Sequence, residues 1–348
     1  MDKNECMKRK SGLLWFIFLL IMSSCVSFEK FSIEVYKPSE LNLAPNIKKV
    51  ALVSRNLKYQ NDTLQNYQVR NHHLIKDKIR FNTDSLAIVT CLDSLSGQLL
   101  AKNKFDNIVI LPVNTFPKNR TKEIRPAAIE WYKTISEKTG SDVLILLDMF
   151  SCFYSLNNDD SNPTANVVTS NIWSVYSAKE QKIINRFTQV DTLFWDEYDE
   201  NGQYKKLRIP DKKNAISLAA GVIGENYAKH ILPSWAKVDR TIMKTGDSEF
   251  QKAAKLAQNT EWEEAVGIWQ NYADSKSKQK RVTALYNLAL AGEMNGNIDQ
   301  AIALTDKAAK VSSGLFMSSE NEAVRKYSAV LYQRKNEINK LTQQHETR

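Results

Sequence analysis

Residues 141–154 read SDVLILLDMFSCFY, and this apolar run decides what kind of domain surrounds it. A near-continuous apolar run of this length is typical of a strand that is buried on both faces. Upstream, PAAIEWYKTISEK (126–138) predicts a helix with Pro126 in its first turn, ended by Thr139-Gly140. Further upstream, FDNIVILPV (105–113) predicts a second buried strand. Strands that alternate with helices indicate an α/β arrangement.

The flanking stretches extend this region in both directions. We expect strands at 31–38, 48–55, 165–178, 183–195 and 234–243, and helices at 83–104 and 211–231. The two strands that follow the quoted run are separated only by turn residues, so the three neighbours predict an antiparallel meander. Together these elements predict a mixed α/β (α+β) domain over residues 31–245.

Residues 56–82 interrupt that pattern, because they are polar and show no clear periodicity. A long excursion of this kind often has a role of its own. One interpretation makes it a lid over a ligand-binding or hydrolytic site at the strand ends. The alternative function for the chain is therefore a periplasmic ligand-binding or hydrolytic α/β domain.

Catalytic chemistry is weakly indicated. Acid–base catalysis needs titratable groups that the fold brings together. The candidates are Asp148, Asp191, the acidic cluster at 196–200, which we expect at a solvated turn, and histidines 72, 73 and 230. Asp148 interrupts an apolar strand, so it is either half-exposed at a strand end or held by a partner; we expect the solvent-facing position. The sequence contains no phosphate-binding glycine loop, nucleophile elbow or metal-ligand spacing. We expect no catalytic residues, cofactor or metal, with a hydrolase of unknown substrate as the alternative.

The N-terminus carries an export signal. Lys3, Lys8, Arg9 and Lys10 precede the apolar run LLWFIFLLIM (13–22), which is too short to span a membrane comfortably. The run closes on IMSSC (21–25), which resembles the lipobox of bacterial lipoproteins. The resemblance implies that residues 1–24 are removed, that Cys25 receives lipid such as palmitate, and that residues 25–30 form a tether. The acyl chains would hold the protein on a membrane without a spanning helix.

Charge and cysteine content narrow the remaining choices. The formal net charge is +9, and removing four basic and two acidic residues with 1–24 leaves +7. The basic residues are scattered, which argues against a nucleic-acid partner. Beyond Cys6 and Cys25, only Cys91 and Cys152 remain, in a predicted helix and a predicted strand. An oxidising periplasm would permit a disulfide between them, and the sequence leaves their pairing open.

The chain after Gly246 turns into alanine-rich helices without a strand signal. Residues 284–313, ALYNLALAGEMNGNIDQAIALTDKAAKVSS, are similar to the tetratricopeptide repeat, in which two helices pack through small residues around a turn glycine. The positions that match the repeat are Leu288 and Ala289 in the first helix, Gly296 in the turn, and Ala301 and Ala308 in the second helix. Gly292 and Thr305 depart from the aromatic residues usual at their positions.

A second, weaker copy lies upstream at 250–273, where Ala265 and Trp269 take the packing positions. An amphipathic stretch at 318–341 would cap the array. We therefore expect an all-α tetratricopeptide-like domain over residues 247–345. The first helices of such repeats line a shallow groove that typically receives a peptide or helix, although a short array can also serve only to pack against its neighbour.

At the scale of the whole chain, the lipobox, KPSEL (37–41), IKKVALVSR (47–55), ILPSW (231–235) and the terminal helices resemble a group of lipoproteins from Bacteroidota. The resemblance implies an N-terminal α/β domain, C-terminal tetratricopeptide-like repeats and an outer-membrane location. Surface export in that phylum usually shows an acidic run after the lipidated cysteine; this chain lacks one, so we expect it to face the periplasm. Asp62-Thr63-Leu64 resembles the phylum's O-glycosylation motif, which makes Thr63 a candidate glycosylation residue.

The sequence thus predicts a membrane-anchored envelope lipoprotein. Its leading function is that of a protein-binding or scaffolding module, with a protein or peptide partner docked on the C-terminal helical repeats.

Overall fold

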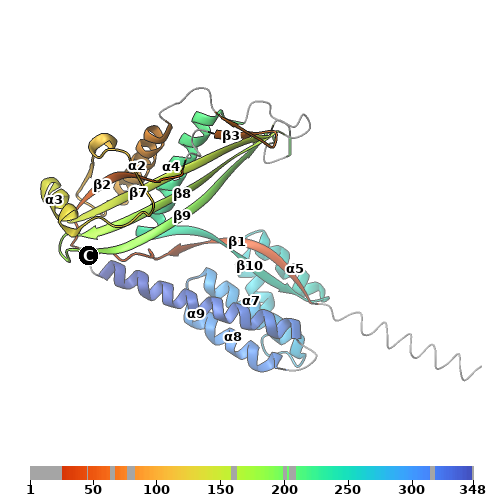
Figure 1. Cartoon of the computed structure of the whole chain (residues 1–348). Coiled ribbons are helices and arrows are strands. Elements are labelled where there is room, and N and C mark those ends of the chain that lie inside the picture. Colours follow the sequence, from red (N-terminus) through yellow and green to blue (C-terminus); the bar gives the residue numbers. More distant parts are fainter. Residues whose placement is uncertain are drawn as a thin grey trace, which may run out of the picture. The chain divides into compact units, whose positions relative to one another are not determined.

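The computed structural model describes residues 26–44, 46–62, 67–76, 83–157, 163–198, 202–203, 209–313 and 318–346 (Figure 1). The leader, Cys25 and Thr63 lie outside the described residues. The chain divides into two compact units. We call Ser39–Pro233 the sheet unit; the ribbon–helix unit combines the described residues up to Pro38 with Ser234–Glu346.

The sheet unit is built around the strand quoted first. Among the described residues, eight strands form one mixed sheet, with β7 (Val143–Asn157) in its middle. One edge of β7 pairs antiparallel with β8 (Thr164–Ser177), which pairs in turn with β9 (Lys182–Asp196). The other edge pairs in parallel, first with β2 (Lys49–Tyr59) and then with β3 (Tyr67–Arg70). The mixed α/β fold and the antiparallel meander are therefore confirmed.

Short strands complete the sheet beside β2 and β3. β5 (Asn107–Ile110) and β6 (Asn119–Thr121) both pair in parallel with β2. β4 (His73–Lys76) pairs antiparallel with β3. The interpretation of residues 56–82 as one irregular lid is wrong for its described part, because residues 67–76 form a hairpin at the sheet edge. β3 and β4 are only four residues long each, β3 half-buried and β4 exposed, so the hairpin lacks the long apolar alternation that identifies a strand.

Helices cover both faces of this sheet. α2 (Thr83–Ala101) and α4 (Lys212–Ile231) pack on one face through Leu92, Leu95, Ile223 and Tyr227, among other buried residues. α3 (Ile129–Thr139) packs on the opposite face through Tyr132 and Ile135, next to Leu144 and Leu146 of β7. Figure 1 shows α2 and α4 side by side near the middle of the sheet unit and α3 at its left end. The sheet is therefore buried on both faces at its centre.

The contact between α2 and α4 depends on one glycine. A Cβ atom added at Gly224 would lie 2.2 Å from the Cys91 carbonyl oxygen and 2.9 Å from the Leu95 amide nitrogen. Real Cβ atoms do not approach backbone atoms so closely, so the two helices can meet at this point only without a side chain. At Gly221, by contrast, the nearest atom would be Thr90 Cγ2 at 3.8 Å.

The ribbon–helix unit joins a two-stranded antiparallel sheet, which we call the ribbon, to an array of helices. β1 (Ser27–Lys37) and β10 (Ser234–Lys244) pair antiparallel over their full length, from Ser27 opposite Lys244 to Lys37 opposite Ser234. The helices that follow are α5 (Ser248–Gln258), α6 (Trp262–Gln270), α7 (Lys278–Met294), α8 (Ile298–Ser312) and α9 (Ser318–Glu346). Ile242 and Met243 of β10 enter the apolar core that these helices form.

The division into units differs from the boundaries expected at 31–245 and 247–345. Residues 27–30, expected as a tether, are the first residues of β1, and both ribbon strands group with the helices instead of the sheet. The reason is physical: alternation of apolar and polar residues identifies a strand and its faces, but it does not say which strand it pairs with. The pairing of β1 with β10 joins residues more than two hundred positions apart.

Candidate functional site

Asp148, the foremost catalytic candidate from the sequence, is completely buried. It occupies a β-bulge of β7, where the pairing with both neighbouring strands shifts between Leu147 and Met149. Its Oδ1 accepts a hydrogen bond from Arg55 Nη1 at 3.0 Å, and its Oδ2 accepts one from Ser174 Oγ at 2.6 Å. The expectation of a solvent-facing Asp148 is therefore wrong, because a bulge re-aims the side chain of its extra residue and here turns the carboxylate toward an arginine.

The arginine that holds Asp148 is itself fixed on several sides. Arg55 Nη1 also donates to the Arg125 carbonyl at 3.0 Å, and its guanidinium lies 5.6 Å from the centre of the Trp131 ring. The arginine side chain is only 11% exposed. A buried ion pair whose two ends are also hydrogen-bonded is well compensated for its loss of water. This cluster therefore locks the middle of the sheet to the α3 segment.

The other titratable candidates lie in separate surroundings. His72 and His73 are exposed at the turn between β3 and β4. Asp191 Oδ2 accepts a hydrogen bond from Gln189 Nε2 at 2.8 Å. His230 is buried, with Nδ1 2.8 Å from Glu40 Oε2 and its ring stacked on Phe187. Each group has its own neighbours, and the structure does not bring these candidates together: the His230–Glu40 contact involves a carboxylate outside the set.

Cys91 and Cys152 are both buried, and no disulfide joins them. Cys91 lies in α2 beside Gly224 and Cys152 lies in β7, as the sequence placed them. Burial raises the pKa of the Cys91 thiol well above its usual range, so it stays protonated and unreactive at neutral pH.

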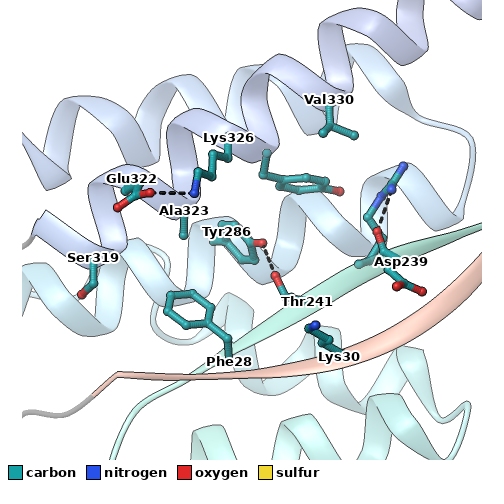
Figure 2. Close-up of a pocket in the computed structure, with 12 residues that line it drawn as sticks. Phe28, Lys30, Asp239, Thr241, Tyr286, Ser319, Glu322, Ala323, Lys326 and Val330 are labelled. Carbon is teal, nitrogen blue, oxygen red and sulfur yellow. Dashed lines mark hydrogen bonds and ion pairs between the residues drawn. The ribbon is translucent and has the colours of Figure 1, made fainter.

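The ribbon–helix unit contains the cavity that we take as the candidate site, and we call it the α9 pocket. Its volume is about 500 Å³, and it lies between the ribbon, α7 and one face of α9. Figure 2 shows Ser319, Ala323, Lys326 and Val330 of α9 along one side and Phe28 of β1 opposite. Their spacing of three to four residues places these α9 side chains on one helix face.

Aromatic rings form the apolar part of the α9 pocket. Phe28, Tyr286 and Tyr327 line it, and the rings of Tyr286 and Tyr327 lie 5.1 Å apart. Tyr286 Oη and Thr241 Oγ1 are hydrogen-bonded at 2.8 Å (Figure 2). Burial raises the pKa of both tyrosines, and the Glu293 carboxylate raises that of Tyr327 further. Both phenols therefore stay protonated at neutral pH and act as hydrogen-bonding surfaces rather than as bases.

Charged residues form the rim of the same pocket. Lys30 comes from β1 and Asp239 from β10, while Lys326 Nζ lies 2.6 Å from Glu322 Oε1 one turn back on α9 (Figure 2). A mostly apolar cavity with a few charged groups at its mouth is the usual form of a recognition site. The α9 pocket has that form.

A buried ion pair forms one wall of the α9 pocket. Arg240 donates from Nε and Nη2 to the two oxygens of Glu293, at 2.8 and 2.6 Å, and Tyr327 Oη donates to Glu293 Oε2 at 2.8 Å. Burial lowers the pKa of Arg240, but the hydrogen bonds that Arg240 donates to the Glu293 carboxylate, together with its charge, outweigh burial and raise the pKa overall. Arg240 lines the α9 pocket, whereas Glu293 lines a second cavity. The pair therefore separates two recesses of one unit.

That second cavity, the β1 groove, has a volume of about 590 Å³. It follows consecutive residues of β1 from Phe31 to Tyr36 and is closed by helix residues that include Trp262, Met294 and Ile338. Aromatic contacts flank it: Phe31 lies 5.5 Å from Trp262, and Tyr36 lies 5.2 Å from Trp235, between ring centres. Trp235 is 63% exposed. Large aromatic surface beside a groove is typical of places where proteins are recognised.

The residues that matched the repeat pattern lie inside the helical core. The side chains of Ala289, Ala301, Ala308, Ala265 and Trp269 are buried, and Leu288 is partly buried against the same core. Gly296, between α7 and α8, has φ +75°, a left-handed conformation that favours glycine. Gly292 faces α8, where a Cβ would lie 3.4 Å from Ala301 Cβ. The helices thus approach through small residues.

The face of α7 that would line a groove in a repeat array already contacts the ribbon. Asn287 of α7 accepts a hydrogen bond at Oδ1 from the Met243 amide, at 3.0 Å, and donates from Nδ2 to the Met243 carbonyl, at 2.8 Å. Two further α7 side chains contact β10: Thr283 Oγ1 donates to Met243 Sδ, and Tyr286 Oη is hydrogen-bonded to Thr241 Oγ1. The chain's own β10 therefore covers part of this face, and the α9 pocket and β1 groove are what stay open around it. Sequence reasoning missed both cavities, because they depend on the ribbon.

Within the described ranges, no group of three or more His, Cys, Asp or Glu side chains is placed to hold a metal ion. None of the helices that the structure describes is both long and apolar enough to cross a membrane.

Comparisons with known proteins give two family matches. The family model described as a domain of unknown function, DUF8603, matches residues 47–242, which is more than half of the chain. A second model, described as a domain of unknown function, DUF6340, matches residues 251–333. No curated protein matches the chain.

Solved structures give weak matches. A minor lipoprotein from Acinetobacter baumannii is 8% identical, with TM-score 0.23, over 54% of this chain and 96% of that one. Lipoprotein GNA1162 from Neisseria meningitidis is 7% identical, with TM-score 0.22, over 52% and 98%. Protein XCC0632 from Xanthomonas campestris is 13% identical, with TM-score 0.27, over 56% and 87%. TM-scores this low carry no argument about fold or function.

Proposed function

The chain belongs to the DUF8603 family, and from that premise we propose that it is a lipid-anchored envelope protein whose ribbon–helix unit binds another protein. In this proposal Cys25 carries the lipid, and a side chain or short segment of the partner enters the α9 pocket. The proposal includes an outer-membrane location facing the periplasm and a tetratricopeptide-like origin for helices α5 to α8. No nucleic acid, metal or cofactor takes part.

The single observation that carries the proposal is the α9 pocket. It offers about 500 Å³ lined by Phe28, Tyr286, Tyr327 and Val330, with charges of both signs at its mouth. Protein interfaces concentrate their binding energy where aromatic residues surround a cavity inside a polar rim. The pocket therefore suits an apolar or aromatic partner side chain flanked by polar groups.

Hydrolysis is the weaker alternative, because no described feature favours it. Asp148 would have to face a substrate at the strand ends, yet it is buried and bound by Arg55 and Ser174. Residues 67–76 of the expected lid belong to the sheet as a hairpin. Binding is therefore the function that we propose.

The pocket is tested by filling it. Ala323→Trp places a large ring inside the α9 pocket, whereas Tyr332→Trp changes a 48% exposed residue of the same helix that does not line it. Tagged full-length protein would be captured from detergent-solubilised envelopes and its partners identified by mass spectrometry. We expect Ala323→Trp to lose at least one partner that Tyr332→Trp retains. Identical partner sets for both variants, at equal protein levels, would contradict the proposal.

The anchor has its own test. Replacing Cys25 by Ala removes the only thiol that the lipobox offers for acylation, so the protein should leave the membrane fraction and lose labelling by a palmitate analogue. A replacement at Ser27, two residues further on, serves as the matched control and should leave both properties unchanged. Membrane retention and labelling of the Cys25→Ala protein would disprove lipid attachment at this residue.

A further inference from the structure

The outer edge of β1, on the side away from β10, is not paired with any strand among the described residues. β1 and β10 form a two-stranded sheet there, so each strand has one edge that no described strand occupies. An open edge presents a row of backbone N–H and C=O groups and is a template for another strand. Which residues present those groups follows from the hydrogen bonds at the ribbon.

Three contacts identify the outward-facing residues. The Met243 N–H donates to Asn287 Oδ1, and the Met243 C=O accepts from Asn287 Nδ2. Both backbone groups of Met243 therefore point away from β1. The Asp239 carbonyl accepts from Arg240 Nη1 at 2.9 Å, and the Tyr36 carbonyl accepts from Arg334 Nη1 at 2.7 Å. In an antiparallel pair, two directly opposite residues point their backbone N–H and C=O groups either toward each other or both away from the partner strand. These two arrangements alternate along the strands.

The register carries this pattern onto β1. Phe28 lies opposite Met243, and Ser32 lies opposite Asp239. The outward backbone groups of β1 therefore belong to its even-numbered residues: Phe28, Lys30, Ser32, Glu34 and Tyr36. Arg334 occupies the Tyr36 carbonyl, whereas Phe28, Lys30, Ser32 and Glu34 are exposed. A stretch of strand edge about seven residues long thus faces outward.

The sequence of that stretch is complementary to itself. In FEKFSIEVY (28–36), a two-fold axis through Ser32 pairs Lys30 of one strand with Glu34 of the other and Phe28 with Tyr36. On the opposite face the same axis pairs Phe31 with Ile33. Opposite charges, aromatic pairs and aromatic–branched pairs directly across an antiparallel ladder are the combinations that stabilise it.

From this self-complementarity we propose that β1 pairs antiparallel with β1 of a second copy of the chain, centred on Ser32. The paired ribbons form a continuous sheet in the order β10, β1, β1 of the second copy, β10 of the second copy. Ser32, Lys30 and Glu34 exchange backbone hydrogen bonds with their counterparts. Each of two Lys30–Glu34 pairs joins the two copies on the exposed face.

The two-fold axis favours a second copy over a foreign strand. A closed two-fold arrangement is the commonest symmetry of protein oligomers, and it requires one surface to be complementary to itself. An unrelated peptide would need only apolar side chains for the β1 groove. It would give no reason for Lys30 and Glu34 to stand at equal distances from Ser32.

A cysteine at the axis tests the pairing in intact membranes. Residues opposite each other in a hydrogen-bonded antiparallel pair have Cα atoms about 5.5 Å apart, within the range of a disulfide. Full-length Ser32→Cys should form a disulfide-linked dimer on mild oxidation, seen on a non-reducing gel. The matched control is Lys237→Cys, an exposed position on the outer edge of β10, which should stay monomeric as the parent chain does.

Charge reversal then identifies the second copy. In the Ser32→Cys background, Lys30→Glu makes both inter-copy pairs repulsive and should lower the cross-linked fraction about tenfold. Glu34→Lys should do the same, and the two changes together restore opposite charges and the dimer. Absence of the Ser32→Cys dimer, equal cross-linking of Lys237→Cys, or failure of the double change to restore the dimer would each overturn the proposal. Lys30 also lines the α9 pocket, whereas Ser32 does not, so the Ser32→Cys cross-link distinguishes a failure of this pairing from a failure of partner binding.

Discussion

Each unit of the molecule contains a buried arginine–carboxylate pair, Arg55–Asp148 in one and Arg240–Glu293 in the other, and the two pairs are used differently. In the sheet unit, Asp148 and Arg55 sit within the sheet, and their remaining contacts go to Ser174, Arg125 and Trp131. In the ribbon–helix unit, Glu293 and Arg240 stand between two cavities that open to solvent. The first pair completes an interior. The second shapes a surface on which something else can bind.

The strands show the same contrast. β7 is paired on both edges and covered by helices on both faces, so the sheet unit uses its central backbone groups internally. β1 is paired on one edge only among the described residues, and four residues of its outward edge are exposed: Phe28, Lys30, Ser32 and Glu34. We therefore expect binding at the ribbon–helix unit, where a strand edge and two cavities are open, and not at the sheet unit.

The largest effect is expected from Asp148→Ala, which removes one partner of the sealed pair. Arg55 is only 11% exposed and would keep an uncompensated charge. Breaking a buried pair in this way costs about 3–5 kcal/mol. Chemical denaturation followed by tryptophan fluorescence should show a loss of about 4 kcal/mol in the unfolding free energy of the sheet unit. A loss below about 1 kcal/mol is typical of a solvent-exposed ion pair and would contradict the burial of Arg55 and Asp148.

Gly224→Ala should come next, because its Cβ would meet the backbone of α2 at Cys91. Overpacking typically costs about 1–3 kcal/mol and more when backbone must move, so we expect a loss of about 3 kcal/mol in the same unit. Gly221→Ala, one turn earlier, meets only ordinary contact and should stabilise α4 slightly, because alanine is the better helix former. Equal stability of the two variants would contradict the described α2–α4 contact.

Glu293→Gln should destabilise less and should also affect binding. The amide keeps the volume but loses the charge that accepts from Arg240 and Tyr327. We expect a loss of about 2 kcal/mol from the ribbon–helix unit, together with weaker partner capture. Asp148→Asn is the matched change in the sheet unit and should leave capture intact. Reduced capture with both variants at equal folded amounts would remove the distinction between the two pairs.

The smallest effect is expected at Asp247, which caps α5. Its Oδ1 accepts from the Glu249 amide at 2.9 Å and its Oδ2 lies 2.5 Å from Lys280 Nζ, and the hydrogen bond from Lys280 lowers the Asp247 pKa. A lowered folded-state pKa contributes stability above the ordinary value of 3.8, and this is lost as pH falls through the folded-state pKa. Asp247→Asn keeps the cap, so it should cost under about 1 kcal/mol at pH 7. The difference from the parent should vanish in acid; a difference independent of pH would contradict this origin.

The sequence allowed the sheet unit to be predicted well and the candidate site poorly. The β7 run, the meander after it and α4 could be predicted because each element is long and its apolar residues form a regular local pattern. The position of Asp148 was missed because a β-bulge depends on the register with β2 and β8. No local pattern announces such a shift.

The α9 pocket was out of reach for a related reason. It needs Phe28 of β1, Thr241 of β10 and Ala323 of α9 in one place, and Phe28 lies more than two hundred positions before the other two. The sequence predicted an amphipathic stretch at 318–341, and the alternation of β1 indicated a strand. Their meeting depends on the pairing of β1 with β10, which alternation alone does not specify.

The most direct test of the central claim compares the two units as sites of contact in living cells. A photo-activated cross-linking residue would replace Val330 in the α9 pocket or, as the matched control, Leu218, a 53% exposed residue of α4 in the sheet unit. We predict a discrete cross-linked protein at position 330, abolished by Ala323→Trp, and none at position 218. Cross-links from position 218 alone, or cross-links at 330 that persist with the pocket filled, would contradict the claim that the ribbon–helix unit is the binding part of this protein.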